Sequence, residues 1–243
     1  REKPRPPRRP GFPDRRAMER ITGAIHRYFE KNPADGLDEM NRIVEERFMG
    51  RSIDEIPSDA ATSLEKAQDL CYAAFEVQGR RRVRMAREAL ALSPDCADAY
   101  NILAEQCGDR EETLRLYEQG VAAGERALGP GRFDTASGPF WGDIRTRPYM
   151  RALQGVAEES ALLGDRAGAI RAYSRLLKLN PGDNQGARDP LVGLLLESGD
   201  TDAAGTLLDQ YKDDPSATML FARALWLFML RGDKATSRRT LEK

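Results

Sequence analysis

Residues 153–181 read LQGVAEESALLGDRAGAIRAYSRLLKLNP, and their apolar spacing predicts two amphipathic helices joined by a tight turn. Gly164 marks the turn, because glycine reaches the positive φ that ends a helix without strain. Ala169 is small enough to let the second helix cross the first closely, and Tyr173 fills the space between them. Pro181 cannot continue the helix, so the chain must turn there and begin another pair.

The same punctuation recurs along the chain. The ending LLKLNP of this stretch has a counterpart in ALALSP at residues 89–94, and Gly-Asp pairs begin at 164, 199 and 232, at intervals of 35 and 33 residues. A unit of this length that returns at a fixed period indicates a helical repeat. No strand pattern of period two is visible. We therefore expect an all-α fold of about five helical hairpins, stacked in a right-handed superhelix.

The order of small and large residues in 153–181 resembles the tetratricopeptide repeat, a helix–turn–helix unit of about 34 residues. With the segments EERFMGRSIDEIP and ALALSPDCADAY, the chain also resembles bacterial tetratricopeptide proteins of unassigned function. Residues 140–188 are loosely similar to the suppressor of tumorigenicity 7 family. The resemblance covers residues 37–230. Chaperone-binding tetratricopeptide domains hold a peptide carboxylate with Lys and Asn where this chain has Gln154 and Glu158, so that ligand is not expected.

Three segments are expected. Residues 1–13, with five prolines and five basic residues, favour extended polyproline II structure, as a flexible tail or as a basic arm for an acidic partner. Residues 14–58 contain two helices without the repeat pattern, which should cap the first hairpin. Residues 59–243 form the tetratricopeptide-like domain. The arm lacks the apolar core of a secretory signal, and no apolar run is long enough to span a membrane, so we expect a cytoplasmic protein with no membrane partner.

The residue types that support catalysis are sparse. The chain has one histidine, His26, and three cysteines without a C-x-x-C pair, Cys71, Cys96 and Cys107, which we expect to be reduced thiols. Zinc needs three or four such ligands together, and no phosphate-binding glycine motif occurs. We therefore expect no catalytic residue, no cofactor and no metal, and the protein is not expected to be an enzyme.

Two stretches carry more polar groups than packing requires, and both lie where a first helix begins. They are WGDIRTRPYM at 141–150 and PGDNQGAR at 181–188. Their guanidinium and amide groups could cap helix ends and bridge repeats, or they could donate to a carboxylate or backbone of a bound segment. On the second interpretation, and with one residue from the C-terminal end, the expected partner-binding residues are Trp141, Arg145, Arg147, Tyr149, Asn184, Gln185, Arg188 and Trp226.

The C-terminal end raises a separate question. Residues 219–230, MLFARALWLFML, are apolar almost all round, and such a helix must be buried on all faces. The segment from 233 onward is short and polar and offers little cover. We expect Trp226, Phe228, Met229 or Leu230 to stay partly exposed, and this end to meet a second copy of the chain, a further helix or the partner.

The leading hypothesis is a non-catalytic protein–protein interaction scaffold or adaptor that binds a partner protein or peptide in the repeat groove or at its ends. The alternative is a nucleic-acid-binding accessory protein that uses the basic arm and the run from Arg80 to Arg87. A net charge of −1 does not favour nucleic acid, and the run lacks interleaved aromatics. The arginines of this run could instead lie on a solvent-exposed helix face and form ion pairs with Glu65, Glu76 and Glu88.

Overall fold

The computed structural model describes residues 15–51, 55–56, 58–134, 140–235 and 238. Within these residues the fold is all-α, as expected, and contains no strand. The helices are α1 (Arg15–Lys31), α2 (Leu37–Arg47), α3 (Ser63–Phe75), α4 (Gly79–Leu92), α5 (Ala97–Glu105), α6 (Arg110–Leu128), α7 (Gly131–Asp134), α8 (Arg147–Leu162), α9 (Arg166–Leu179), α10 (Arg188–Ser198), α11 (Thr201–Gln210) and α12 (Ala217–Arg231), with short 3-10 helices η2 (Phe140–Gly142) and η3 (Ile144–Thr146).

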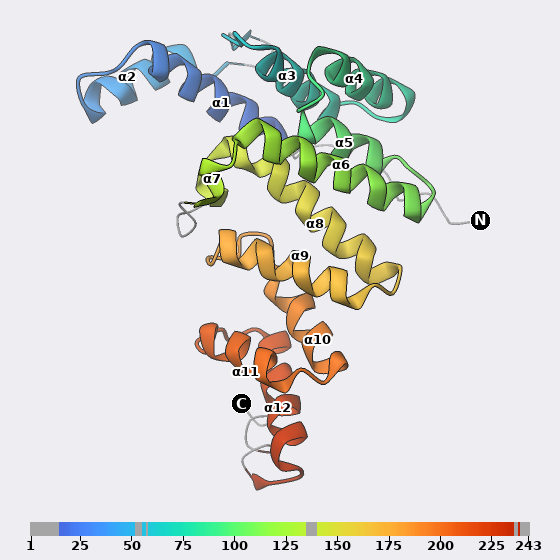
Figure 1. The fold of residues 1–243 in the computed structure, drawn as a ribbon. Coiled ribbons are helices and arrows are strands. Elements are labelled where there is room, and N and C mark those ends of the chain that lie inside the picture. The colour runs from blue at the N-terminus through green and yellow to red at the C-terminus, as the bar shows by residue number, and fades with distance from the viewer. Residues whose placement is uncertain (1–14, 52–54, 57, 135–139, 236–237, 239–243) are drawn as a thin grey trace.

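From α3 to α12, successive helices other than the short α7 pack against each other along an elongated array (Figure 1). The helix pairs are α3 with α4, α5 with α6, α8 with α9 and α10 with α11, and α6 packs closely on α8. The array begins with α1–α4 at one end and finishes with α12 at the other. Four of the expected pairs are therefore present. The second helix of the fifth pair lies largely outside the described residues.

The turn residues behave as the sequence predicts. Gly164 and Gly199 have φ of 84° and 79°. The aspartate that follows each glycine caps the next helix: Asp165 accepts a hydrogen bond from the Gly168 N–H, and Asp200 accepts one from the Ala203 N–H. Each Gly-Asp pair thus ends one helix and starts another, which explains why it recurs at the repeat interval.

Replacing Gly164 with valine should lower the free energy of unfolding by about 1–2 kcal/mol or more, because a β-branched residue is strained at positive φ. A Cβ at this position has nothing within 4 Å, so backbone strain alone sets the effect. Gly164→Asn is the matched control, since asparagine tolerates this conformation better. Urea unfolding should rank the two in that order, and equal stability of the valine variant and the native protein would contradict the turn assignment.

The stretch before the central pair is more helical than expected. The first helix of that pair, α8, begins at Arg147 rather than near Leu153, and Pro148 lies in its first turn, where proline fits well. Thr146 is buried and its hydroxyl donates to the carbonyl oxygens of Phe140 and Asp143. The sequence IRTRP does not predict this helix start, because Pro148 is equally compatible with a turn.

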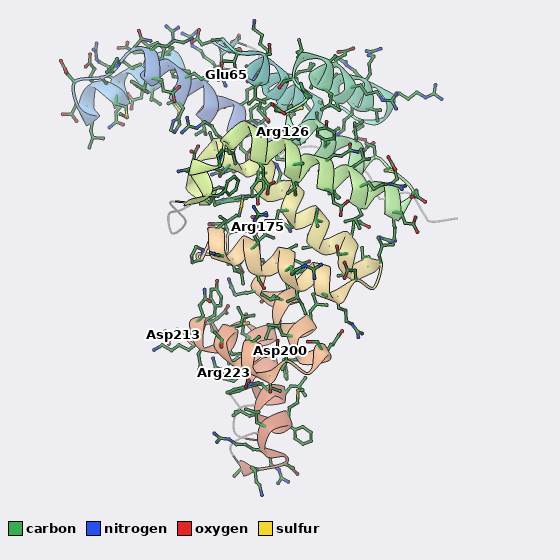
Figure 2. All side chains as sticks on the ribbon, in the orientation of Figure 1. Glu65, Arg126, Arg175, Asp200, Asp213 and Arg223 are labelled. Carbon is green, nitrogen blue, oxygen red and sulfur yellow. The ribbon has the colours of Figure 1, made fainter. Side chains whose placement is uncertain are left out.

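The described parts of the insertion, residues 129–134 and 140–142, contain the short helix α7, and their phenylalanines pack on the core, as the aromatic residues suggested. The Phe133 ring lies 5.5 Å from that of Phe140 and 5.3 Å from that of Tyr149. Arg175 of α9, labelled in Figure 2, lies 5.6 Å from the Phe133 and Tyr149 rings and donates to Glu125 of α6 at 2.8 Å. Residues 135–139 of the insertion lie outside the described part.

Apolar side chains gather in separate clusters along the array. The largest runs through α8–α12, and a second joins α3, α4 and α5. A third belongs to the N-terminal segment: Ala24, Phe48 and Ile56 are buried with one another, and Ile21, Ile25 and Tyr28 pack against them. Helix α2, described throughout, has no buried residue. None of the helices in the described ranges is long and apolar enough to cross a bilayer.

Candidate functional site

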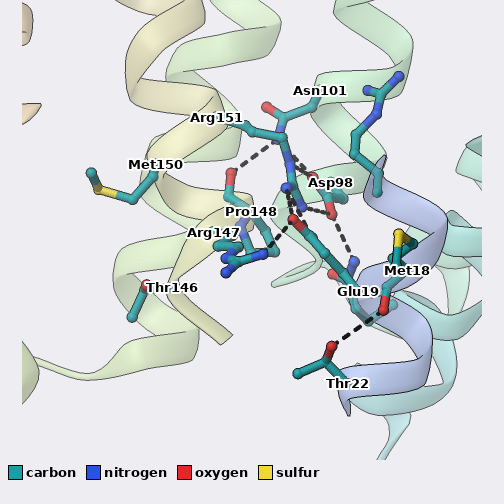
Figure 3. A network of polar contacts seen from close by, with 12 residues as sticks. Met18, Glu19, Thr22, Asp98, Asn101, Thr146, Arg147, Pro148, Met150 and Arg151 are labelled. Atoms are coloured by element: carbon teal, nitrogen blue, oxygen red, sulfur yellow. Dashed lines mark hydrogen bonds and ion pairs between the residues drawn. The ribbon is translucent and has the colours of Figure 1, made fainter. Parts of the chain in front are cut away.

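A buried charged network joins three helices that are far apart in the sequence (Figure 3). Asp98 lies in the first turn of α5 and is fully buried, and Arg151 projects from α8. The Arg151 Nε and Nη2 donate to the two Asp98 carboxylate oxygens at 2.9 and 2.6 Å. The Arg151 Nη1 donates to both oxygens of Glu19 in α1, at 3.0 and 2.9 Å.

Neutral donors complete the shell of Asp98. Gln68 of α3 donates to it at 2.7 Å and Asn101 at 3.0 Å, and Asn101 also donates to the Pro148 carbonyl at 2.9 Å. Burial favours a raised pKa for Asp98, but the charge and hydrogen bonds of Arg151 outweigh it and leave the pKa below its ordinary value. Burial likewise opposes the charge of Arg151, and Asp98 and Glu19 outweigh it, so its pKa is raised. Both groups are ionised.

Glu19 lies between two guanidinium groups. Besides Arg151, it accepts a hydrogen bond at 3.2 Å from Nη1 of Arg147, one helical turn earlier in α8. The Arg147 Nε donates to the Trp141 carbonyl at 3.0 Å, and its guanidinium lies 5.0 Å from the Trp141 ring. Only 5% of Glu19 is exposed. The arrangement is a two-arginine carboxylate site whose carboxylate comes from the chain itself.

A cavity of about 390 Å³ adjoins this network. It lies between α1, α3, the start of α5, the end of α6 and η3. Its polar lining includes the bases Arg27, Arg132 and Arg145, the acids Glu30, Glu65, Asp95 and Asp143, and the side chains of His26 and Gln68. Several of these are already paired, as Arg27 is with Asp69 and Arg145 with Asp143. The cavity shows that α1 does not fill the space between itself and the helix pairs.

The expected partner-binding residues of the first stretch have different surroundings. Arg147 and Trp141 contact each other as described, and Arg147 reaches α1. Arg145 is exposed and pairs with Asp143 at 3.1 Å and with Glu30 of α1 at 3.5 Å. Tyr149 lies in the core, where Gly124 of α6 leaves room for it.

The second stretch forms a cluster of its own. Arg188 pairs with Asp183 at 3.1 Å and with Asp214 at 2.6 Å, and Asp183 accepts from the backbone N–H groups of Ala187 and Arg188. These contacts cap α10 and tie it to the segment before α12. Gln185 donates to the Met150 carbonyl and to Gln154, both in α8. Asn184 is exposed.

The last described helix has one uncovered apolar face. Four side chains of α12 with i, i+4, i+7 and i+8 spacing, and hence on one face, are substantially exposed: Phe221 63%, Leu225 50%, Phe228 53% and Met229 40%. We call these four the α12 face. Leu230 is also 49% exposed, so exposure at this end is confirmed. Trp226 is only partly exposed, because it packs on Gly205 and donates to the Thr201 carbonyl at 2.8 Å.

Other chemistry-bearing residues are dispersed. His26 is exposed on α1. The three cysteines are free, and Cys71 and Cys96 are buried with their Sγ atoms 3.6 Å apart. The hydrogen bond between Cys71 and Cys96, with burial, raises the pKa of Cys71. Across the described residues, no three His, Cys, Asp or Glu side chains form a group that could hold a metal.

The basic run opens α4, as the sequence suggested, but not all of it faces solvent. Arg82 turns inward, where its guanidinium binds Glu105 and lies 5.5 Å from the Phe75 ring. Arg84 pairs with Glu88 on the helix surface, and Arg80, Arg81 and Arg87 are exposed. Residues 1–13, the other half of the expected nucleic-acid surface, lie outside the described residues.

Sequence reasoning missed Glu19, Asp98 and Arg151. Asp98 follows Pro94 at the start of a helix, where an aspartate is ordinarily exposed to solvent and interacts favourably with the helix dipole. Its position in the sequence therefore did not indicate burial. Its pairing with Arg151 spans 53 residues and that of Arg151 with Glu19 spans 132. One signal was present: Asp98 lies between alanines in an otherwise small and apolar turn, ADAYNILA, which suggests a tightly packed surrounding.

Comparisons of the chain with protein-family models, with curated proteins and with solved structures gave no significant match.

Proposed function

We propose that this chain is a non-catalytic interaction scaffold, a tetratricopeptide-like superhelix that binds a partner protein at its ends and in its groove. The observation that carries the proposal is the α12 face. Supporting it are the sequential packing of helix pairs and the Gly-Asp turns at the repeat interval. On this proposal the protein is cytoplasmic and uses no cofactor.

In a helical array each pair buries an apolar face against the next, so a helix face that the described residues leave uncovered is expected to be polar. The α12 face is instead formed by two phenylalanines, a leucine and a methionine. Single exposed apolar residues are ordinary, but several on one face of a helix mark a surface that another polypeptide covers.

Leu225→Glu and Phe221→Glu are expected to abolish partner binding at this end, because burying an unpaired carboxylate in an apolar interface is strongly unfavourable. Both side chains are exposed in the free chain, so helicity and thermal stability should stay unchanged. Leu162→Glu is the matched control: Leu162 is 60% exposed at the end of α8, away from α12. Sedimentation velocity of the purified chain and co-purification from the native host are the measurements.

The proposal requires that the native chain and the Leu162→Glu variant give the same larger species, a dimer or a complex with another protein. The two α12 variants should sediment as monomers and lose the co-purifying protein. Identical behaviour of all four proteins would contradict the assignment of α12 as an interface.

A further inference from the structure

Helix α1 is joined to the helix pairs through charged side chains. Arg16 donates to Glu105 at the end of α5 at 2.7 Å, and Glu19 is bound by the two arginines of α8. Two turns further on, Arg27 donates to both Asp69 oxygens in α3, at 3.1 and 3.2 Å, and to the Ser58 carbonyl. Helix α1 thus lies across α3, α5 and α8 with an ion pair to each.

Its apolar side chains serve a different cluster. Ile21, Ile25 and Tyr28 pack with Ala24 around Phe48 and Ile56, in the segment that follows α1. The main cluster of the first two helix pairs is formed by other residues, from α3, α4 and α5. The N-terminal segment therefore has a small core of its own, and its contacts with α3, α5 and α8 include ion pairs to each and the Arg16 guanidinium 4.0 Å from the Phe75 ring.

The two arginines that bind Glu19 are positioned by residues outside α1. In Arg151, Nε and Nη2 are bound by Asp98, and Nη1 is directed at Glu19. In Arg147, Nε is bound by the Trp141 carbonyl, the guanidinium lies over the Trp141 ring, and Nη1 is again directed at Glu19. Each guanidinium is thus oriented by a residue outside α1, Asp98 of α5 or Trp141 of η2, and directs one Nη at the Glu19 carboxylate. A site oriented in this way keeps its geometry when its ligand leaves.

We propose that Arg147 and Arg151 form a carboxylate-recognition site for an acidic residue on a partner helix, and that α1 is the internal ligand that occupies it until the partner displaces it. The inference deepens the proposed scaffold role and rests on it. The cavity of about 390 Å³ borders α1 between Gly23 and Glu30, so α1 is not packed tightly against the helix pairs along this length, and its lining includes Gln68, which donates to Asp98 of the network.

The geometry of α1 also specifies the chemistry of that partner. Three positions before Glu19, Arg16 pairs with Glu105. Eight positions after Glu19, Arg27 pairs with Asp69. These offsets lie along one side of a helix. The partner is therefore a helix that carries an acidic residue flanked by arginine or lysine at the same offsets. A partner that bound equally well to the form with α1 in place and to the form with α1 released could not displace α1. The charges of the partner helix must therefore match the site that α1 leaves open.

A fluorescent peptide with the sequence of residues 15–31 tests the proposal in the full chain. Its binding is measured by anisotropy to the native chain and to the Glu19→Gln chain, in which the internal helix has lost its carboxylate. The labelled peptide should bind the Glu19→Gln chain at least about tenfold more tightly, a typical size for coupling between two binding events. The same peptide carrying Glu19→Gln should lose that gain.

Two controls make the result specific. The Glu30→Gln chain changes another acid of α1, whose partner Arg145 is exposed, and should bind the peptide as weakly as the native chain does. Adding Arg147→Ala to the Glu19→Gln chain should reverse the gain. Equal binding of the peptide to native and Glu19→Gln chains, or undiminished binding of the substituted peptide, overturns the proposal.

If Glu19→Gln affects folding, amide hydrogen exchange distinguishes local release of α1 from unfolding of the whole chain. The proposal requires α1 amides to exchange at least about tenfold faster in this variant, while α5 and α8 stay protected. Loss of protection throughout the chain would show that α1 is an integral part of the fold and would overturn the proposal. The α12 variants test the opposite end of the array, so failure there is distinguishable from failure here.

Discussion

Replacing Arg151 with alanine is expected to lower the free energy of unfolding by about 3–5 kcal/mol, the largest effect of any single change considered for this protein. The variant leaves Asp98 fully buried without its cationic partner and removes one of the two guanidiniums around Glu19. Urea unfolding followed by circular dichroism measures the loss. Arg115→Ala is the matched control, because Arg115 pairs with Glu112 on the surface and should contribute less than about 1 kcal/mol.

The pH dependence of the free energy of unfolding provides a second test of this prediction. In the native chain the pKa of Asp98 lies below its unfolded value, so the pair's contribution is complete above pH of about 4 and is lost as pH falls through the folded pKa. In the Arg151→Ala variant burial acts without that opposing charge and raises the pKa of Asp98. Protonation then stabilises the variant, and the difference between the two proteins should narrow on acidification. A small deficit that does not change with pH would contradict a buried, ionised pair.

Gly124→Val is expected to produce the second largest loss, about 3 kcal/mol. Helices α6 and α8 approach closely at this glycine: an added Cβ would lie 2.7 Å from the Tyr149 Cβ and 3.2 Å from its Cα. Those atoms belong to the backbone end of a fully buried residue and cannot rotate away, so the helices must separate. The consequence extends to the Phe133 and Phe140 rings that pack on Tyr149.

Gly193→Ala is the matched control for Gly124→Val. Gly193 lies inside α10, and a Cβ there has nothing within 4 Å. Alanine should therefore stabilise the helix by about 0.5–1 kcal/mol through its higher helix propensity. Thermal and urea unfolding of both variants should give shifts of opposite sign. A Gly124→Val chain as stable as the native one would mean that α6 and α8 do not meet as described.

The features that local sequence could predict are those with local causes. The positive φ of Gly164 and Gly199, the capping aspartates and the helix pairs around them follow from residues a few positions apart. The exposed α12 face was also predictable, because residues 219–230 are apolar on nearly every side and the preceding hairpin can cover only one of them. The start of α8 was not, since Thr146 gains its role only when its hydroxyl reaches the Phe140 carbonyl.

The candidate site was only partly predictable, for a physical reason. Arg147 was recognised as an unusual polar residue, but the interpretation could not include its ligand, which comes from a helix 128 residues earlier. Arg188 was grouped with it by sequence position, whereas the structure pairs Arg188 with Asp183 and Asp214. Periodicity predicts which face of a helix is apolar, but it contains no information on which distant charges meet when helices pack.

The measurement that tests the scaffold proposal most directly is photo-crosslinking from the α12 face inside the native host. A photoreactive phenylalanine analogue would replace Phe221, which is 63% exposed, and, as the control, Arg115 on the exposed surface of α6. We expect a discrete crosslinked species of higher mass from position 221, containing a second protein or a second copy of this chain, and none from position 115. The absence of any adduct at 221, or the same adducts at both positions, would contradict the scaffold proposal.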